Sequence, residues 1–267
     1  MRAGYDPRRR SRHIGTAAQG HGADNRLVVP RSRALGVRSE VRLGEHRVVH
    51  RQLAGRRRTF LVEPTRPDCW HACTIDDMCR ILRHVPAADL DGLSLFVLRQ
   101  PTRKQELLHP VWGRLSFWIS IGAHCGAGVV LEAVQTPSTF RQPHRLRPFA
   151  ARERQRLLDD GHEVDTDRRG VTFRVTLHSA RNTQLYRTLP HEIGHWVDYR
   201  RQSPERYWQR TFREREEAAH RYADAFGQRL AAAGHIPFPR IVDPRTIRAD
   251  GLDPTDFRPP CSPDTAG

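Results

Sequence analysis

The segment Thr188-Leu-Pro-His-Glu-Ile-Gly-His-Trp-Val-Asp-Tyr199 carries the pattern H-E-x-x-H, with His191, Glu192 and His195 at its fixed positions. Residues four apart share one face of a helix, so the two histidines can each turn a ring nitrogen toward a single ion. Glu192 can hold a water beside that ion and take its proton. The uncharged residues around them favour a buried helix. This segment predicts a metal centre with His191 and His195 as ligands and Glu192 as the catalytic base.

A catalytic zinc site needs a third protein ligand and leaves its fourth position to water. The helical run at residues 214–227 offers three candidates, namely Glu216, Glu217 and His220. Glu216 is favoured because it shares a helical face with Ala219 and Ala223, whose small side chains would let this helix approach the first one. Glu216 is thus the predicted third metal ligand, and His220 and Glu217 stay open as alternatives.

The motif and its surroundings resemble the zincin metallopeptidases over residues 171–230. The resemblance is to the gluzincin-like branch, whose third ligand comes from a later helix, and it is closest to the ImmA/IrrE group. It implies Zn²⁺ as the cofactor and a peptide or protein as the substrate. It also implies hydrolysis of the peptide bond by a water that the metal activates and Glu192 deprotonates.

In that branch the second helix typically carries Glu, then Ala three residues on, an amide or acid four on and an aromatic residue six on. This chain fits the register with Glu216, Ala219, His220 and Tyr222, so a histidine stands where Asn or Asp is usual. A second register that starts at His220 would make that histidine the ligand, oriented by Asp224.

Two parts of the mechanism stay open in the sequence. The donor that stabilises the oxyanion has four candidates, namely Tyr207, Tyr222, His178 and His220. The strand expected at residues 171–177 is, by analogy with the zincin fold, the sheet edge on which an extended peptide lies.

Pro190 directly precedes His191, where a proline inside a helix would remove a hydrogen bond. We therefore expect the motif helix to begin within a turn of Pro190, capped by Thr188, with residues 181–188 as a loop. Asp198 lies on the same helical face as the two histidines. Three interpretations of Asp198 remain: an orienting residue, an alternative ligand, or the partner of a buried arginine.

Apolar runs and period-two alternation predict strands at residues 93–98, 115–121, 129–134 and 171–177. We expect them to form one small twisted sheet packed on two metal-bearing helices, which is a zincin-like α+β fold. Three regions are expected along the chain: an Arg-rich disordered tail at 1–60, a catalytic domain at 61–235 and a Pro-rich segment at 236–267, which is either a disordered tail or a wrapping arm without a fold of its own.

Charge supports a different class of function. The chain has 45 Lys and Arg residues against 30 Asp and Glu, and 15 arginines but only four acidic residues fall in residues 1–60. Such a tail can bind nucleic acid or an acidic partner without sequence specificity. A third possibility is a zincin-like fold that is catalytically silent.

The sequence does not favour a membrane or a secreted protein. The apolar run at residues 115–134 carries His124, Glu132 and three glycines, so two strands fit it better than a membrane helix. The first 30 residues hold no apolar segment of signal-peptide length. Five cysteines, an odd number, do not suggest a disulfide framework. We therefore expect a cytoplasmic protein without a membrane partner.

Overall fold

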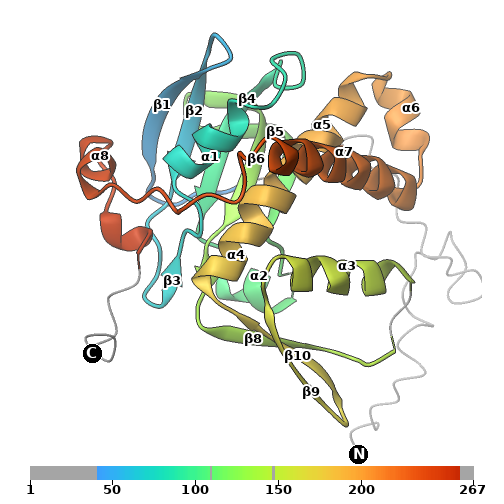
Figure 1. Ribbon diagram of the computed structural model, residues 1–267. Coiled ribbons are helices and arrows are strands. Elements are labelled where there is room, and N and C mark those ends of the chain that lie inside the picture. Colours follow the sequence, from blue (N-terminus) through green and yellow to red (C-terminus); the bar gives the residue numbers. More distant parts are fainter. Residues whose placement is uncertain (1–40, 109, 146–147, 259–267) are drawn as a thin grey trace, which may run out of the picture. The chain divides into compact units, whose positions relative to one another are not determined.

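The computed structural model describes residues 41–108, 110–145 and 148–258, in which three β-sheets and a set of helices confirm the α+β class (Figure 1). The strands are β1 (Arg47–Leu53), β2 (Arg56–Val62), β3 (Cys69–Trp70), β4 (Leu93–Arg99), β5 (Gly113–Ile121), β6 (His124–Glu132), β7 (Val134–Gln135), β8 (Ser138–Gln142), β9 (Glu163–Asp167) and β10 (Gly170–Val175). The helices are α1 (Ile75–Leu82), α2 (Arg103–Leu108), α3 (Pro148–Asp159), α4 (Leu177–Asn182), the π-helical η3 (Thr183–Thr188), α5 (Leu189–Arg200), α6 (Pro204–Gln209), α7 (Phe212–Ala232), α8 (Pro244–Ala249) and the 3₁₀-helical η4 (Pro254–Asp256).

The largest sheet has five strands in the order β1-β2-β4-β6-β5. β1 and β2 form an antiparallel hairpin that turns at Ala54 and Gly55, both with positive φ. β2, β4 and β6 run parallel, and the apolar β4 is buried along most of its length, as a strand covered on both faces requires. β5 pairs antiparallel with β6, and no strand among the described residues pairs with its other side. β5 is therefore an open edge.

One strand that was expected in this sheet lies in another sheet. The strand predicted at residues 171–177 is β10, and it lies between β8 and β9 in a separate three-stranded sheet. A peptide can add only to an edge that offers unpaired N–H and C=O groups, and β10 is paired on both sides. The expectation that this strand forms the peptide-binding edge is therefore also wrong.

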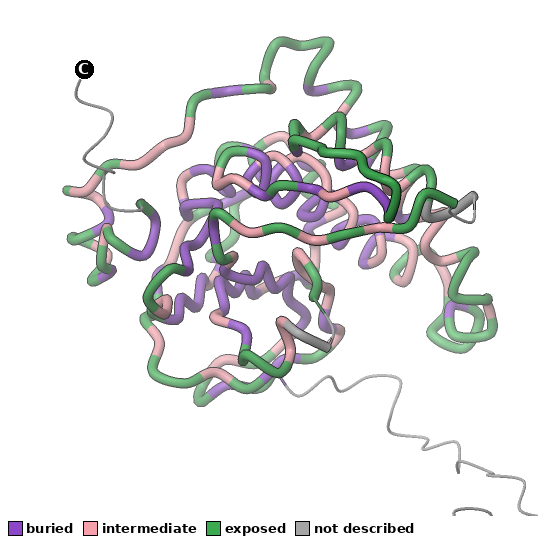
Figure 2. Tube along the Cα trace, turned by 90° about the horizontal axis from the view of Figure 1, so that it is seen from below, coloured by how far each residue is buried: buried purple, intermediate pink, exposed green. Residues whose placement is uncertain are grey.

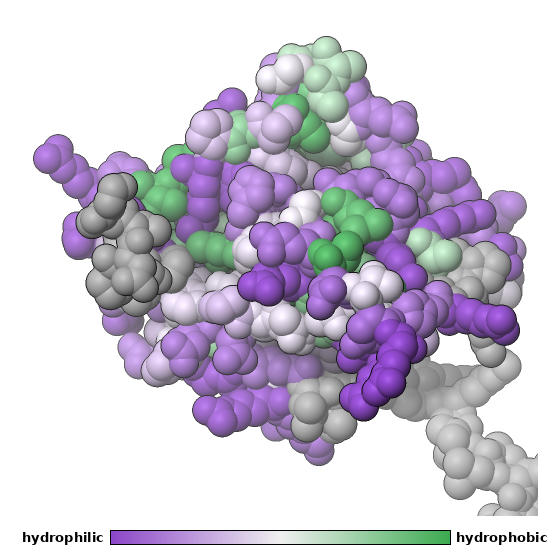
Figure 3. Space-filling view, turned by 60° about the horizontal axis from the view of Figure 1, so that its bottom comes forward, coloured by the Kyte–Doolittle hydropathy of each residue, from purple (hydrophilic) through white to green (hydrophobic). Residues whose placement is uncertain are grey.

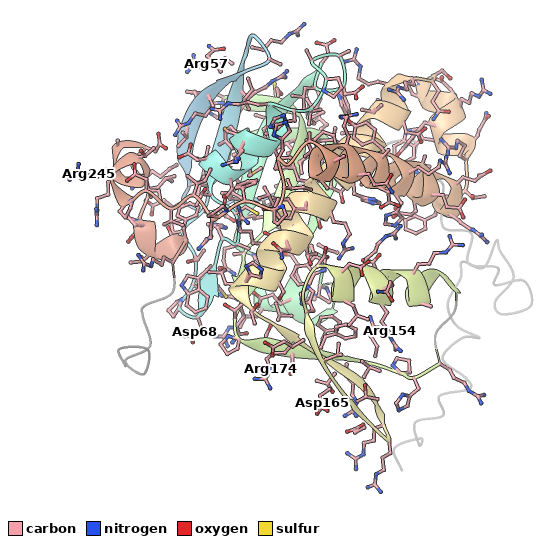
Figure 4. All side chains as sticks on the ribbon, viewed as in Figure 1. Arg57, Asp68, Arg154, Asp165, Arg174 and Arg245 are labelled. Carbon is pink, nitrogen blue, oxygen red and sulfur yellow. The ribbon has the colours of Figure 1, made fainter. Side chains whose placement is uncertain are left out.

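The structure contradicts the expected disordered tail over residues 47–60, where β1 and most of β2 lie. Val49, Leu53 and Phe60 are buried, so the apolar residues of these strands face the core. Of the arginines between them, Arg56 and Arg57 are exposed and Arg58 is buried, and Arg57 projects outward from the hairpin in Figure 4. High charge concealed the alternation of two half-buried strands. The rest of the predicted tail, residues 1–40, lies outside the described residues.

Of the two alternatives for the Pro-rich segment, the structure supports the wrapping arm over residues 236–258. This segment carries α8 and η4 and wraps along the body of the fold (Figure 1). Four of its apolar side chains are buried in the main core, namely Phe238, Ile247, Leu252 and Phe257. Burial of these side chains stabilises the segment without a sheet or a long helix of its own. Residues 259–267 lie outside the described residues.

The motif helix begins earlier than expected. Thr176 caps α4, and the chain continues as helix through η3 into α5. Residues 181–188 are therefore helical and not a loop, and Thr188 makes no side-chain cap. The π-helical turn directly before Pro190 relaxes the hydrogen-bond pattern that proline cannot complete, which explains how a proline is tolerated here.

Buried residues gather between the five-stranded sheet and the helices that cover it (Figure 2). One of these helices, α1, starts at a capping box of Thr74 and Asp77 and buries Met78, Ile81 and Leu82. On the face shown in Figure 3, hydrophilic side chains predominate and hydrophobic ones form small separate patches. In the described ranges no helix is long and apolar enough to cross a membrane.

Candidate metal centre

The two helices that carry the predicted ligands cross in close contact. At the crossing Gly194 of α5 faces Ala219 of α7, and a Cβ built on Gly194 would lie 2.9 Å from the Ala219 carbonyl oxygen. Ala219 and Ala223 are both buried, which confirms the expectation that small residues line this face. Since a side chain at position 194 would hold the helices apart, glycine is what lets Glu216 of α7 reach the motif.

Glu216 lies between the two histidines of the motif. Its Oε2 is 3.4 Å from Nε2 of His191, and its Oε1 is 3.3 Å from Nε2 of His195. Atoms bound to one tetrahedral zinc ion lie about 3.4 Å apart, so each separation suits a pair of ligands. These three side chains are between 11% and 17% exposed, which leaves them mostly shielded from solvent.

His220 is a fourth donor at the same place. Its ring centroid lies 4.4 Å from that of His191, and the ligand atoms of His191, Glu216 and His220 all lie within 4.8 Å of one another. His195 is not in this group of three, and its link to the group is the contact of its Nε2 with Oε1 of Glu216. Three imidazoles therefore gather around one carboxylate.

Contacts among these groups set their charges. Burial would raise the pKa of the Glu216 carboxyl, but hydrogen bonds from His191 and His195 outweigh it and hold this pKa well below its usual range. Burial would lower the pKa of His195, yet the Glu216 and Glu192 carboxylates raise it. Burial and the nearby His191 lower the pKa of His220 to about 4. At neutral pH the His220 imidazole is thus uncharged, the form that binds metals.

The far side of the two motif histidines has no hydrogen bonds. Nδ1 of His191 and Nδ1 of His195 are buried, and no residue in the described part of the chain bonds to them. Metal-binding histidines usually donate this N–H to a neighbour that orients the ring. Here the two rings pack against each other, with centroids 4.7 Å apart and planes 84° apart. The donor set fits an ion through Nε2 and the carboxylate, with packing in place of outer hydrogen bonds.

Glu192 lies beside the open edge of the five-stranded sheet. The side chain is buried, and its Oε2 accepts the backbone N–H of Leu115 at 2.7 Å. Leu115 lies in β5, and its N–H points toward Glu192 of α5 instead of pairing with β6. The residue that the motif predicts as the base is therefore tied to the strand edge where a peptide could lie.

Three other acidic residues considered as ligands or orienting groups pair with arginines elsewhere. The pairs are Asp198 with Arg210 at 2.5 Å, Glu217 with Arg213 at 2.8 Å and Asp224 with Arg156 at 3.5 Å. The arginine-partner interpretation of Asp198 is thus the one that the structure supports. Neither Glu217 nor Asp224 joins the group of donors.

Of the oxyanion candidates outside the donor group, Tyr207 is the one on which the Glu216 carboxylate acts electrostatically, and its hydroxyl also bonds to Arg215. It is buried on α6, and burial together with charges that include the Glu216 carboxylate raises the pKa of its hydroxyl to about 12. The hydroxyl therefore keeps its proton at neutral pH and can donate. Tyr222 instead donates to Asp89 at 2.9 Å. His178 makes its hydrogen bond within α4 at an exposed position.

A cavity of about 610 Å³ lies beyond the start of β5, and none of the donors is among the residues that line it. Trp112 and Arg114 form one wall, and Arg114 directly precedes Leu115, which donates to Glu192. Phe140 of β8 lines another wall. Glu153 of α3 lines a third, close enough to His220 for the two to interact electrostatically. The volume is in the range of ligand-binding clefts.

Neither the role of the Leu115 N–H nor the cavity was predicted from the sequence. Leu115 acts through its backbone N–H, which no side-chain pattern marks. Its strand was predicted, but its position at the edge depends on the order of the strands. The cavity walls come from β5, β8 and α3, which only the tertiary structure brings together.

Comparison of the chain with protein-family models, with curated protein sequences and with solved structures finds no match in any of the three.

Proposed function

We propose that this protein is a zinc-dependent peptidase in which His191, His195 and Glu216 hold the ion and Glu192 is the general base. The observation that carries the proposal is the position of Glu216, whose two oxygens lie 3.4 Å and 3.3 Å from the Nε2 atoms of the motif histidines. We also propose that the fold is zincin-like. A sheet edge packed beside two ligand-bearing helices supports it.

The donor set favours zinc among the metals that proteins use. Two imidazoles and one carboxylate make up the His₂Glu set of catalytic zinc sites, which keep one position for water. When bound, zinc would polarise the scissile carbonyl and acidify a water. Glu216 would contribute the negative charge of the set, and its depressed pKa keeps it ionised across the neutral range.

Glu192 supplies the proton transfers in this proposal. Its carboxylate would accept a proton from the attacking water and deliver it to the leaving amine. The hydrogen bond from the Leu115 N–H fixes the direction of one carboxylate oxygen. Tyr207 is the candidate donor to the oxyanion, because its buried hydroxyl lies near Glu216.

Two features support a peptide as the substrate. An extended peptide can add to the open edge of β5 as a further strand, and this edge passes directly beside Glu192. The cavity at the start of β5 has aromatic walls from Trp112 and Phe140 and can take side chains of that peptide. Main-chain pairing would hold the peptide in line with the base.

Metal analysis and a peptide-library assay of the full chain test the proposal. Wild type and Glu192→Gln should each hold about one zinc per chain, and His191→Ala should lose it. Glu192→Gln should cut hydrolysis by about 10²- to 10⁴-fold, the usual share of a general base. His178→Asn is the matched control, since His178 lies at an exposed position on α4. Wild type without zinc, or full hydrolysis by Glu192→Gln, would refute the proposal.

A further inference from the structure

His220 occupies a ligand position that a three-ligand site does not need. It lies one turn after Glu216 on α7, so both side chains project from the same face of the helix. Its ring centroid is 4.4 Å from that of His191, and its ligand nitrogen belongs to the group that converges within 4.8 Å. An imidazole is a strong zinc ligand, unlike the amide that the register leads us to expect here.

The structure does not support Asp224 as the residue that orients His220. Asp224, which would orient His220 in the second register, is half exposed and faces Arg156. His220 instead turns toward the motif helix. Ligand atoms on a tetrahedral ion are about 3.4 Å apart, so those of His191, Glu216 and His220, which lie within 4.8 Å, would have to close a gap of little more than an ångström. Side-chain rotation alone can supply a movement of this size. His195 is linked to this group through the other oxygen of Glu216, at 3.3 Å.

We infer that His220 is a fourth protein ligand, which together with His191, His195 and Glu216 closes the coordination shell of the resting protein. Four protein ligands characterise structural zinc sites, whereas catalytic sites keep one position open. Given the proposed peptidase function, His220 must leave its position before a water or a substrate carbonyl can take it. The resting chain is then a latent enzyme, and His220 is the group that a substrate displaces.

Cobalt and zinc binding by the full chain test this inference without an activity assay. The metal-free protein is loaded with one equivalent of Co²⁺, whose visible spectrum reports the coordination number, and is titrated with thiocyanate as a small competing ligand. X-ray absorption of the zinc form counts the imidazoles. We expect three imidazoles and no response to thiocyanate in wild type. His220→Asn should show two imidazoles and a thiocyanate-dependent spectrum.

Affinity alone does not separate a ligand from a neighbour, because outer residues also change metal affinity by about 10- to 100-fold. The imidazole count is therefore the deciding measurement. We expect His220→Asn to bind zinc at least tenfold more weakly than wild type and His178→Asn to match wild type. Two imidazoles in wild type, or a thiocyanate response equal to that of His220→Asn, would overturn the inference. Should His220→Asn fail to fold, the count on wild type still decides.

The same experiments distinguish a failure of this inference from a failure of the proposed function. Three imidazoles in wild type with no Glu192-dependent hydrolysis, even in His220→Asn, would support the closed site and refute the peptidase. Hydrolysis that depends on Glu192 together with two imidazoles in wild type would support the peptidase and refute the closed site. Loss of zinc in His191→Ala is required by both.

Discussion

Gly194 and Ala219 meet where α5 crosses α7, so closely that a Cβ on Gly194 would lie 2.9 Å from the Ala219 carbonyl oxygen. His191 and His195 flank Gly194 on one helix, and Glu216 lies one turn before Ala219 on the other. The distance between the two backbones therefore sets the distance between the donors.

Gly194→Ala should move α5 and α7 apart, and this movement should also weaken the proposed metal site. Since the added methyl group meets backbone atoms, we expect the free energy of unfolding to fall by about 1 to 3 kcal/mol. Zinc affinity should fall as well, because Glu216 moves away from the histidines. Denaturant unfolding and chelator competition measure the two effects. Gly227→Ala is the control, since a Cβ there meets nothing within 4 Å. Unchanged zinc affinity in Gly194→Ala would show that this contact does not position the donors.

Asp77→Asn should destabilise the fold strongly without touching the metal site. Asp77 is fully buried and pairs with Arg181 at 2.9 Å, and it also accepts the backbone N–H of Ile241. Loss of the carboxylate leaves a buried guanidinium without its countercharge, which costs about 3 to 5 kcal/mol. Denaturant unfolding measures this.

The control is Arg213→Ala, which removes an exposed pair on α7 and should leave stability close to that of wild type. If the two variants were equally stable, the Asp77 pair would contribute no more than a surface pair does.

His71 should make the fold less stable in mild acid. Its Nε2 donates to the Glu63 carbonyl oxygen at 2.7 Å, and burial lowers the pKa of the ring below its unfolded value. Below about pH 6.5 the unfolded chain therefore binds a proton that the folded chain does not, and stability falls as the pH drops. Urea unfolding at pH 7, 6 and 5 should give a steeper loss for wild type than for His71→Gln, by up to about 1.4 kcal/mol per pH unit. Parallel losses in the two proteins would contradict this.

Tyr207→Phe should slow hydrolysis and leave zinc in place. The buried Tyr207 hydroxyl interacts electrostatically with Glu216, and loss of one oxyanion donor reduces turnover by about 10²- to 10³-fold. Steady-state kinetics should show the loss in kcat, with KM little changed. Tyr222→Phe is the control, because that hydroxyl is bonded to Asp89. An equal effect of both substitutions would point to packing as the cause.

Several features of the fold were predictable because they depend on near neighbours in the sequence. The runs at 93–98, 115–121 and 129–134 became β4, β5 and β6. The high arginine content hid strands β1 and β2, whose apolar residues Val49, Leu53 and Phe60 are buried. At residues 236–258 the prolines left a disordered tail and a wrapping arm open, and single buried apolar side chains hold this irregular segment to the core as an arm.

By itself the sequence determined that His191 and His195 share a helical face with Glu192 beside them, because a spacing of four is set by local helix geometry. It also marked Glu216, Ala219 and Ala223 as one face. The tertiary structure alone decided which acid reaches the histidines, that β5 and not β10 is an open edge, and that His220 lies against His191. These facts follow from one helix crossing and one strand order. Both are long-range packing choices, and no local stretch of residues encodes them.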